Sequence, residues 1–344
     1  MIYNLQVLRA LAAWMVVAHH LRTPLGEIWP PLGDTLIFAS GVDIFFVLSG
    51  YVMVASTKSR QISAASFWRR RLTRIAPLYW LVTSAILAAL LIGLSPVGVA
   101  AWNWRDVGAS YLFLGAERHD GYPGPLLGVG WTLAYEAFFY AIFGLALMVR
   151  THSAAWVGSA IAAIVVLGLV VSPTSFAGQF YTSPILLEFA LGAGLAKFSL
   201  DRWGGAFLGL GVIGMIAGAG FLATLAPSGD LITPAGEGAY WRTLCFGVPA
   251  ALIVAGALAC EHSAVICRNQ FVLDQGDASY ALYLIHLPII QMLEKALGSG
   301  AAVLLISPPI LAIAAHLMHQ KWERPVLTAL RPRRFDLRTY KLAG

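Results

Sequence analysis

Long stretches without a single charged residue constrain this chain more than any other feature of its sequence. Residues 78–94, 155–171 and 207–226 contain no Asp, Glu, Lys or Arg, and the whole chain is 58% hydrophobic and only 12% charged. About 20 mostly apolar residues are enough to cross a bilayer as an α-helix. Lipid offers the backbone no hydrogen-bond partners, so each span must be helical or belong to a closed barrel. The runs are continuous rather than alternating, unlike barrel strands, so the sequence predicts an all-α, polytopic transmembrane helix bundle.

We expect about ten spans, joined mostly by short loops. They are predicted at residues 5–22, 36–56, 74–94, 131–149, 155–172, 180–198, 204–226, 240–260, 277–297 and 301–321. The first is expected to be a retained helix rather than a signal peptide, because no basic cluster precedes it. The longest connection, about 95–130, is expected to be an ordered outer lid or interfacial segment. Residues 1–344 are therefore interpreted as a single domain.

The positions of Lys and Arg predict how the bundle is oriented. If the N-terminus is cytoplasmic, the cytoplasmic side carries 17 of the 23 Lys and Arg residues, the outer side carries 4, and 2 lie within spans. Such an excess is typical of cytoplasmic loops. Both termini, and a basic tail at about 322–344, are therefore expected in the cytoplasm.

The sequence shows no sign of a nucleic-acid-binding site, a metal site or a redox site. The net charge of +6 is attributed to membrane orientation, and no nucleic-acid-binding module is visible. Cys245, Cys260 and Cys267 form no metal or redox motif and are expected to be small packing residues, so no metal site is predicted.

Arg9 and His20 are the most informative residues of the first span. They are eleven positions apart, which is almost three helical turns, so they share a helix face with about 16 Å of rise between them. His19 points about 80° away from that line. Because charged groups in the hydrocarbon region are costly and usually functional, we expect both to face one cavity, with Arg9 near its cytoplasmic mouth. The alternative is an arginine that extends to the interface and an interfacial histidine pair.

Two carboxylates are predicted at the depth of His20. Asp43 is expected in the outer half of the second span and Glu136 at a similar depth in the fourth, since both spans run inward from the outer side. A histidine beside carboxylates suits a general base whose partners orient it and raise its basicity. Alternatively, each carboxylate neutralises Arg9 or a helix end, since structural ion pairs resemble such sites.

Arg71 and Arg74 form a second candidate site at the start of the third span. They are three residues apart and therefore lie on one helix face. Guanidinium groups bind phosphate in a bidentate manner, which favours a phosphate-rich cytosolic donor. Arg69 and Arg70 precede them and are equally well explained as orientation signals.

A third group of polar residues lies in the ninth span. Ser279, Tyr283 and His286 follow the i, i+4, i+7 pattern of one helix face, and Tyr280 is adjacent in sequence. His286 precedes Pro288 by two residues, and a proline can open a helix locally. Packing and helix–helix hydrogen bonds explain this stripe as well as a substrate site does. Glu188 in the sixth span is a further acid without an evident partner.

These residues fall in motifs that resemble the acyltransferase 3 family of bacterial membrane acyltransferases. Arg9 and His20 resemble the family's Arg/Lys-(ten residues)-His motif, although the doubled His19-His20 leaves only the spacing to favour His20. Arg71-Leu-Thr-Arg74 resembles its Arg-x-x-Arg motif. Further blocks follow in the same order through most of the transmembrane core: GVDIFFVLSG at 41–50, WTLAYE at 131–136, SYALYLIH at 279–286 and ERP at 323–325. Residues 5–12 are similar to the branch that acetylates exopolysaccharide.

The resemblance implies a membrane O-acyltransferase of the bacterial inner membrane. Its co-substrate would be acyl-CoA, with acetyl-CoA expected, held by Arg71 and Arg74 with the pantetheine arm running past Arg9. His20 would act as a base or as a transient acyl carrier, oriented by Asp43 and Glu136. The acceptor would be a carbohydrate of exopolysaccharide or lipopolysaccharide type, either polymeric or lipid-linked.

Two other functions compete with this interpretation. A transporter or flippase of a lipid-linked sugar would be expected to show inverted repeats and broken helices at the midplane, and no such repeat is visible. A polysaccharide polymerase or ligase would use a polyprenyl-phosphate donor, with its arginines on the outer side. Release of thiol from acetyl-CoA distinguishes acyl transfer from both.

Overall fold

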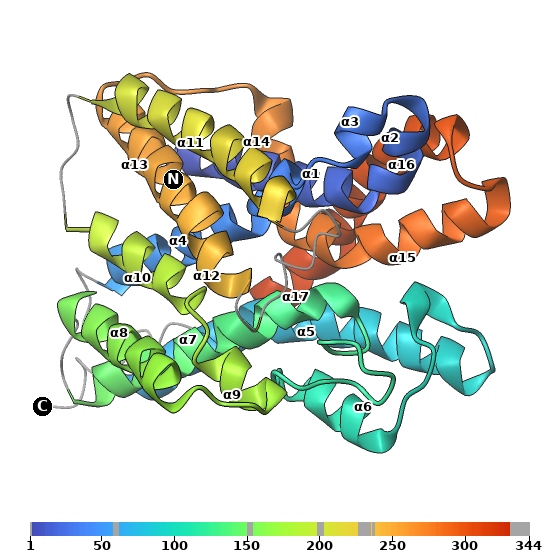
Figure 1. Cartoon of the computed structure of the whole chain (residues 1–344), viewed down its shortest axis with the longest axis horizontal. Helices are drawn as coiled ribbons and strands as arrows, with labels where there is room; N and C mark the ends of the chain where they lie inside the picture. The colour runs from blue at the N-terminus through green and yellow to red at the C-terminus, as the bar shows by residue number, and fades with distance from the viewer. Residues whose placement is uncertain are drawn as a thin grey trace, which may run out of the picture.

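A computed structural model shows the chain as a bundle of helices (Figure 1). It describes residues 2–57, 62–149, 154–197, 203–225, 235 and 238–330, and these ranges contain helices and no β-strand. This confirms the all-α class. The longer helices are α1 (Tyr3–His20), α4 (Gly41–Thr57), α5 (Ala64–Leu91), α7 (Trp131–Met148), α8 (Ala154–Val171), α10 (Leu186–Leu195), α11 (Gly204–Leu225), α13 (Val248–His262), α15 (Ser279–Leu297) and α16 (Ala301–Met318). Shorter α-helices are α2 (Arg22–Ile28), α3 (Pro30–Gly33), α6 (Trp104–Tyr111), α9 (Phe176–Tyr181), α12 (Gly238–Arg242), α14 (Gln270–Asp277) and α17 (Arg324–Ala329). Short 3-10 helices are η1 (Ile37–Ser40), η2 (Pro96–Gly98) and η3 (Gly128–Gly130), and π-helices are η5 (Thr243–Gly247) and η6 (His319–Glu323).

Seven of the described helices are long and apolar enough to cross a membrane. They are Pro30–Thr57, Ala64–Leu91, Gly128–Met148, Ala154–Val171, Gly204–Leu225, Gly238–His262 and Ala301–Ala329. The other three expected spans correspond to α1, α15 and the pair α9 and α10. The first two are long but contain the charged and polar residues of the predicted site, and the third is interrupted at residues 182–185. The number ten therefore stays a prediction.

The orientation of the bundle also stays a prediction. Several of the basic residues on which it rests lie outside the described residues, namely Lys58, Arg60, Arg150, Arg202 and those of the tail at 331–344.

Glycines allow α4 and α10 to cross at close range. A Cβ atom at Gly50 of α4 would lie 2.0 Å from the backbone oxygen of Phe189, and one at Gly192 of α10 would lie 1.9 Å from that of Val47. No Cβ approaches a backbone oxygen this closely, so the crossing needs glycine on both helices. Small residues at such crossings are typical of membrane helices, where close packing replaces the hydrophobic effect.

Helix α1 packs among elements that are distant in sequence (Figure 1). It contacts α4, α13, α14 and α15. A Cβ at Gly41 would lie 2.4 Å from the oxygen of Ala12, and one at Gly276 would lie 2.4 Å from that of Gln6. These contacts fix the position of α1, which carries Arg9 and His20, relative to α4 and α14.

The predicted outer connection at about 95–130 is ordered in the structure and contains η2, α6 and η3. Asn103 and Asp106 form a reciprocal capping box at the start of α6, and Trp80 Nε1 of α5 donates to the oxygen of Tyr111, 3.0 Å away. Further along, Arg118 pairs with Asp120 at 2.7 Å. This hydrogen-bonded guanidinium holds the pKa of the Asp120 carboxyl well below its usual range.

Candidate active site

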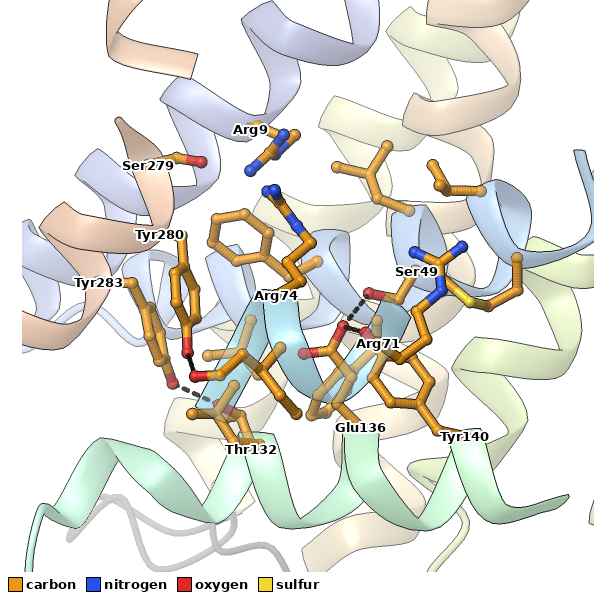
Figure 2. Close-up of a pocket in the computed structure, with 18 of the residues that line it drawn as sticks. Arg9, Ser49, Arg71, Arg74, Thr132, Glu136, Tyr140, Ser279, Tyr280 and Tyr283 are labelled. Atoms are coloured by element: carbon orange, nitrogen blue, oxygen red, sulfur yellow. Dashed lines mark hydrogen bonds between the residues drawn. The ribbon is translucent and has the colours of Figure 1, made fainter. Parts of the chain in front are cut away.

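A cavity of about 470 Å³ lies between α1, α4, α5, α7, α15 and η6. Figure 2 shows its polar side chains converging from these helices. Seven of the ten residues predicted to form the site line it: Arg9, Arg71, Arg74, Glu136, Ser279, Tyr280 and Tyr283. The structure thus brings the basic residues of α1 and α5 together, but His20, Asp43 and His286 are not among the residues that line this cavity.

Two of the three arginines are held by neutral partners. Arg9 Nη1 donates to Gln6 Oε1 at 3.3 Å, and Arg71 Nη2 donates to Ser56 Oγ at 3.0 Å. The Arg71 guanidinium also lies 5.5 and 5.9 Å from the ring centres of Phe67 and Tyr140. Within the described part of the chain, Arg9, Arg71 and Arg74 form no ion pair. Arg9 and Arg74 extend toward each other (Figure 2), an arrangement that an anion between them would stabilise.

Glu136 lies on the arginine side of the site rather than beside His20. Its carboxylate accepts a hydrogen bond from Ser49 Oγ at 3.2 Å and another from the hydroxyl of Tyr140 (Figure 2). The expectation that Glu136 orients His20 therefore does not match the geometry. The position of a residue along its span predicts its depth in the membrane. Contact with another helix also depends on the direction in which the side chain points.

Asp43 likewise contacts a different partner from the one expected. It is fully buried and binds Arg242 in a bidentate pair, with Nε at 3.0 Å and Nη2 at 2.8 Å from its two oxygens. Arg242 Nη2 also donates to the oxygen of Ala39, and the guanidinium lies 5.6 Å from the ring centre of Trp131. Arg242 is one of the four basic residues predicted on the outer side of the membrane. In the structure its side chain is buried and only 2% exposed. A charge at the edge of an apolar span was the available signal for this pair.

Glu188 lies beside the same pair. It is fully buried, and a Cβ at Gly247 would lie 2.7 Å from its Cγ, so the carboxyl packs against the π-helix η5. Its charge would interact with both Asp43 and Arg242. The acid without an evident partner thus belongs to a buried cluster that joins α4, α10 and α12.

His20 contacts His286 of α15. The two ring centres are 4.9 Å apart, and His286 Nε2 lies 3.4 Å from His20 Nδ1. His286 is fully buried and His20 is partly buried. Among the described residues, neither Asp43 nor Glu136 hydrogen-bonds with His20. The nearest predicted partner of His20 is therefore another histidine.

Tyr283 connects the cavity to the histidine pair. Its hydroxyl lies 2.7 Å from Thr132 Oγ1 and donates to the oxygen of Val129 at 2.9 Å. Its ring centre is 5.9 Å from that of His286. One turn earlier, the hydroxyl of Tyr280 donates to the backbone oxygen of Ile75. The predicted stripe on α15 thus extends from the cavity to His286, which contacts His20.

Several residues that line the cavity were not predicted. Gln6, Ser49, Thr132, Tyr140, Asp277 and His319 belong to this group. Most lie within four residues of a predicted site residue, so helical spacing could have identified them. His319 is different, because η6 carries it into the cavity and Glu323 accepts from it at 2.9 Å.

Comparisons with known proteins identify the family to which this chain belongs. The model of the acyltransferase domain family, Acyl_transf_3, matches residues 2–318, so the chain belongs to this family. With its seven apolar helices, it is a multi-pass membrane protein.

Individual relatives point in the same direction. The exopolysaccharide production protein ExoZ of Rhizobium meliloti is 35% identical over 90% of this chain and 94% of its own length. Acyltransferase MdmB of Streptomyces mycarofaciens is 25% identical over 96% and 93% of the two chains. The peptidoglycan O-acetyltransferase OatA of Listeria monocytogenes is 31% identical over 41% of this chain and 23% of its own length. No solved structure matches.

Proposed function

We propose that this acyltransferase moves an acyl group, with acetyl expected, from acyl-CoA to a hydroxyl group of a cell-surface carbohydrate. The observation that carries the proposal is the cavity in which Arg9, Arg71 and Arg74 converge without an ion pair among the described residues. Three guanidinium groups against the two carboxylates of Glu136 and Asp277 favour an anionic guest. Phosphate is the group that guanidinium binds best in a bidentate manner.

The positive charge of this cavity suits acyl-CoA. Its phosphates would bind Arg71 and Arg74. Arg9 lines the same cavity and lies on α1, the helix that also carries His20. The uncharged pantetheine arm would then extend past the α15 stripe and Tyr283. In the predicted orientation, the end of the cavity lined by Arg71 and Arg74 faces the cytoplasm, where acyl-CoA is made.

His20 is the residue proposed to carry the reaction. The hydroxyl oxygen of the carbohydrate attacks the thioester carbonyl carbon while a ring nitrogen of His20 takes the hydroxyl proton. The C–O bond forms, the C–S bond breaks, and the CoA thiolate leaves with the proton that His20 returns. If His20 instead carries the acyl group, the same nitrogen first attacks the thioester and then passes the group to the hydroxyl. The products are the same ester and CoA thiol in both cases.

The carbohydrate acceptor is proposed from the relatives. One is described as an exopolysaccharide production protein and another as a peptidoglycan O-acetyltransferase. An exopolysaccharide is therefore the first acceptor to test, with lipopolysaccharide and lipid-linked sugars next. The bacterial inner membrane is the compartment in which such a donor and such an acceptor can meet.

Thiol release by purified protein tests the proposal. The full chain in nanodiscs is given acetyl-CoA and exopolysaccharide isolated from a strain that lacks the gene. We expect CoA thiol and polysaccharide-bound ester to appear in equal amounts, and His20→Ala to abolish both while leaving the thermal stability unchanged. A transporter of lipid-linked sugar would release no thiol, and full activity in the His20 variant would remove the proposed chemistry.

A further inference from the structure

His20 and His286 make the same local contact, and this contact determines which ring nitrogen carries a proton. His20 Nδ1 lies 3.0 Å from the backbone oxygen of Val16, and His286 Nδ1 lies 3.1 Å from that of Leu282. Each carbonyl belongs to the residue four positions earlier. A carbonyl oxygen can only accept, so both Nδ1 atoms must carry hydrogen.

The contact between the two rings then has a fixed direction. In a neutral imidazole with hydrogen on Nδ1, Nε2 bears a lone pair and accepts. His286 Nε2 lies 3.4 Å from His20 Nδ1, so the Nδ1–H of His20 is shared between Val16 and His286. His20 Nε2 is consequently the basic nitrogen of that ring.

We propose that His286 is a positioning residue that, together with the Val16 carbonyl, holds His20 in the tautomer whose Nε2 is free to take a proton or an acyl group. The inference rests on the proposed function, because it assigns a role relative to the reaction of His20. It gives the α15 stripe a purpose that the sequence left open between packing and chemistry. A histidine that orients another histidine here takes the place of the carboxylate that often does so.

The buried position of His286 also suits the moment at which His20 becomes charged. When His20 Nε2 takes the hydroxyl proton, its Nδ1–H becomes the donor of a charge-assisted hydrogen bond to His286 Nε2, and such bonds are about twice as strong as neutral ones. His286 has no exposed surface. Moving the Nδ1 proton from His20 to His286 would transfer the positive charge from a partly buried ring to a fully buried one, which is costly, so the charge stays on His20.

Substitutions at His286 that differ only in their acceptor test this role. Glutamine can place Oε1 near the position of Nε2, whereas asparagine is too short and leucine has no acceptor. We expect His286→Leu and His286→Asn to lower kcat for acetyl-CoA thiol release by at least about tenfold, with KM for acetyl-CoA within twofold of the native value. His286→Gln should recover most of the lost kcat.

The outcomes separate this role from a structural one and from failure of the proposed function. Native kcat in His286→Leu, or equal losses in the Gln and Asn variants, would overturn the inference while His20→Ala remains inactive. If the Leu variant does not fold, the comparison of Gln with Asn decides alone. Activity in His20→Ala would instead overturn the proposed function.

Discussion

At the scale of single residues, the pair of Asp43 and Arg242 favours a structural role for Asp43 over the catalytic role predicted from the sequence. The carboxylate is fully buried and its bidentate partner is 2% exposed. Removing one member of such a pair leaves a charge without compensation, which costs about 3–5 kcal/mol. We expect Asp43→Asn to lower the melting temperature of the purified protein sharply. Asp34→Asn, which changes an exposed carboxylate, is the matched control.

The double variant Asp43→Leu/Arg242→Met should be more stable than Asp43→Asn, since it removes both charges together. Loss of acyl transfer by Asp43→Asn at native stability would contradict this structural role. It would return Asp43 to the catalytic role predicted from the sequence.

Residue-level prediction from the sequence succeeded where spacing along one helix was enough. The three-residue separation of Arg71 and Arg74 places both in the cavity that Arg9 also lines. It did not succeed for Glu136 and Asp43, because their partners Ser49 and Arg242 lie on other helices, and these contacts depend on how neighbouring helices are rotated. That rotation is set by packing between segments as far apart as 199 positions, and no local pattern records it.

At the scale of helices, the crossing of α4 and α10 depends on contacts that no larger residue can make. Gly192→Ala would place its Cβ 1.9 Å from the backbone oxygen of Val47, and a backbone atom cannot move aside cheaply. We expect this variant to lose about 1–3 kcal/mol of stability, the usual cost of overpacking. Thermal unfolding in detergent measures it.

Gly194→Ala is the matched control on the same helix, because a Cβ there would meet nothing within 4 Å. It should leave the melting temperature within experimental error or raise it slightly, since alanine favours the helix. Equal melting temperatures for the two variants would mean that α4 and α10 do not cross as described.

Two helices that depart from the simplest apolar pattern carry part of the site. Residues of α1 and α15 include Arg9, His20, Tyr283 and His286, and neither helix is among the seven apolar spans. Apolar runs identify helices that face lipid, so they work well for α8 and α11. Helices that surround a polar cavity need the motif spacing as well.

At the scale of the whole molecule, the positions of Lys and Arg predict how the bundle is oriented in the membrane. Ser66 lies in the first turn of α5 and Arg105 lies in α6, in the connection that follows α5, and both are exposed. The arginine mouth, the end of the cavity lined by Arg71 and Arg74, is predicted to face the cytoplasm. A membrane-impermeant maleimide should therefore label Arg105→Cys in spheroplasts and Ser66→Cys only in inverted vesicles. The unsubstituted chain, with its three native cysteines, gives the background. The reverse pattern would place the arginine mouth outside.

Binding of CoA to the purified chain tests the central claim, that the arginine cavity holds a phosphate-bearing acyl donor. Calorimetry in nanodiscs should show one CoA per chain. Arg71→Ala/Arg74→Ala should weaken binding at least about tenfold, since a hydrogen bond to a charged group contributes about 1.5–3 kcal/mol. Arg69→Ala/Arg70→Ala removes the same charge from exposed positions and should retain nearly native affinity. Equal weakening by the two pairs, or no CoA binding by the native chain, would contradict the account.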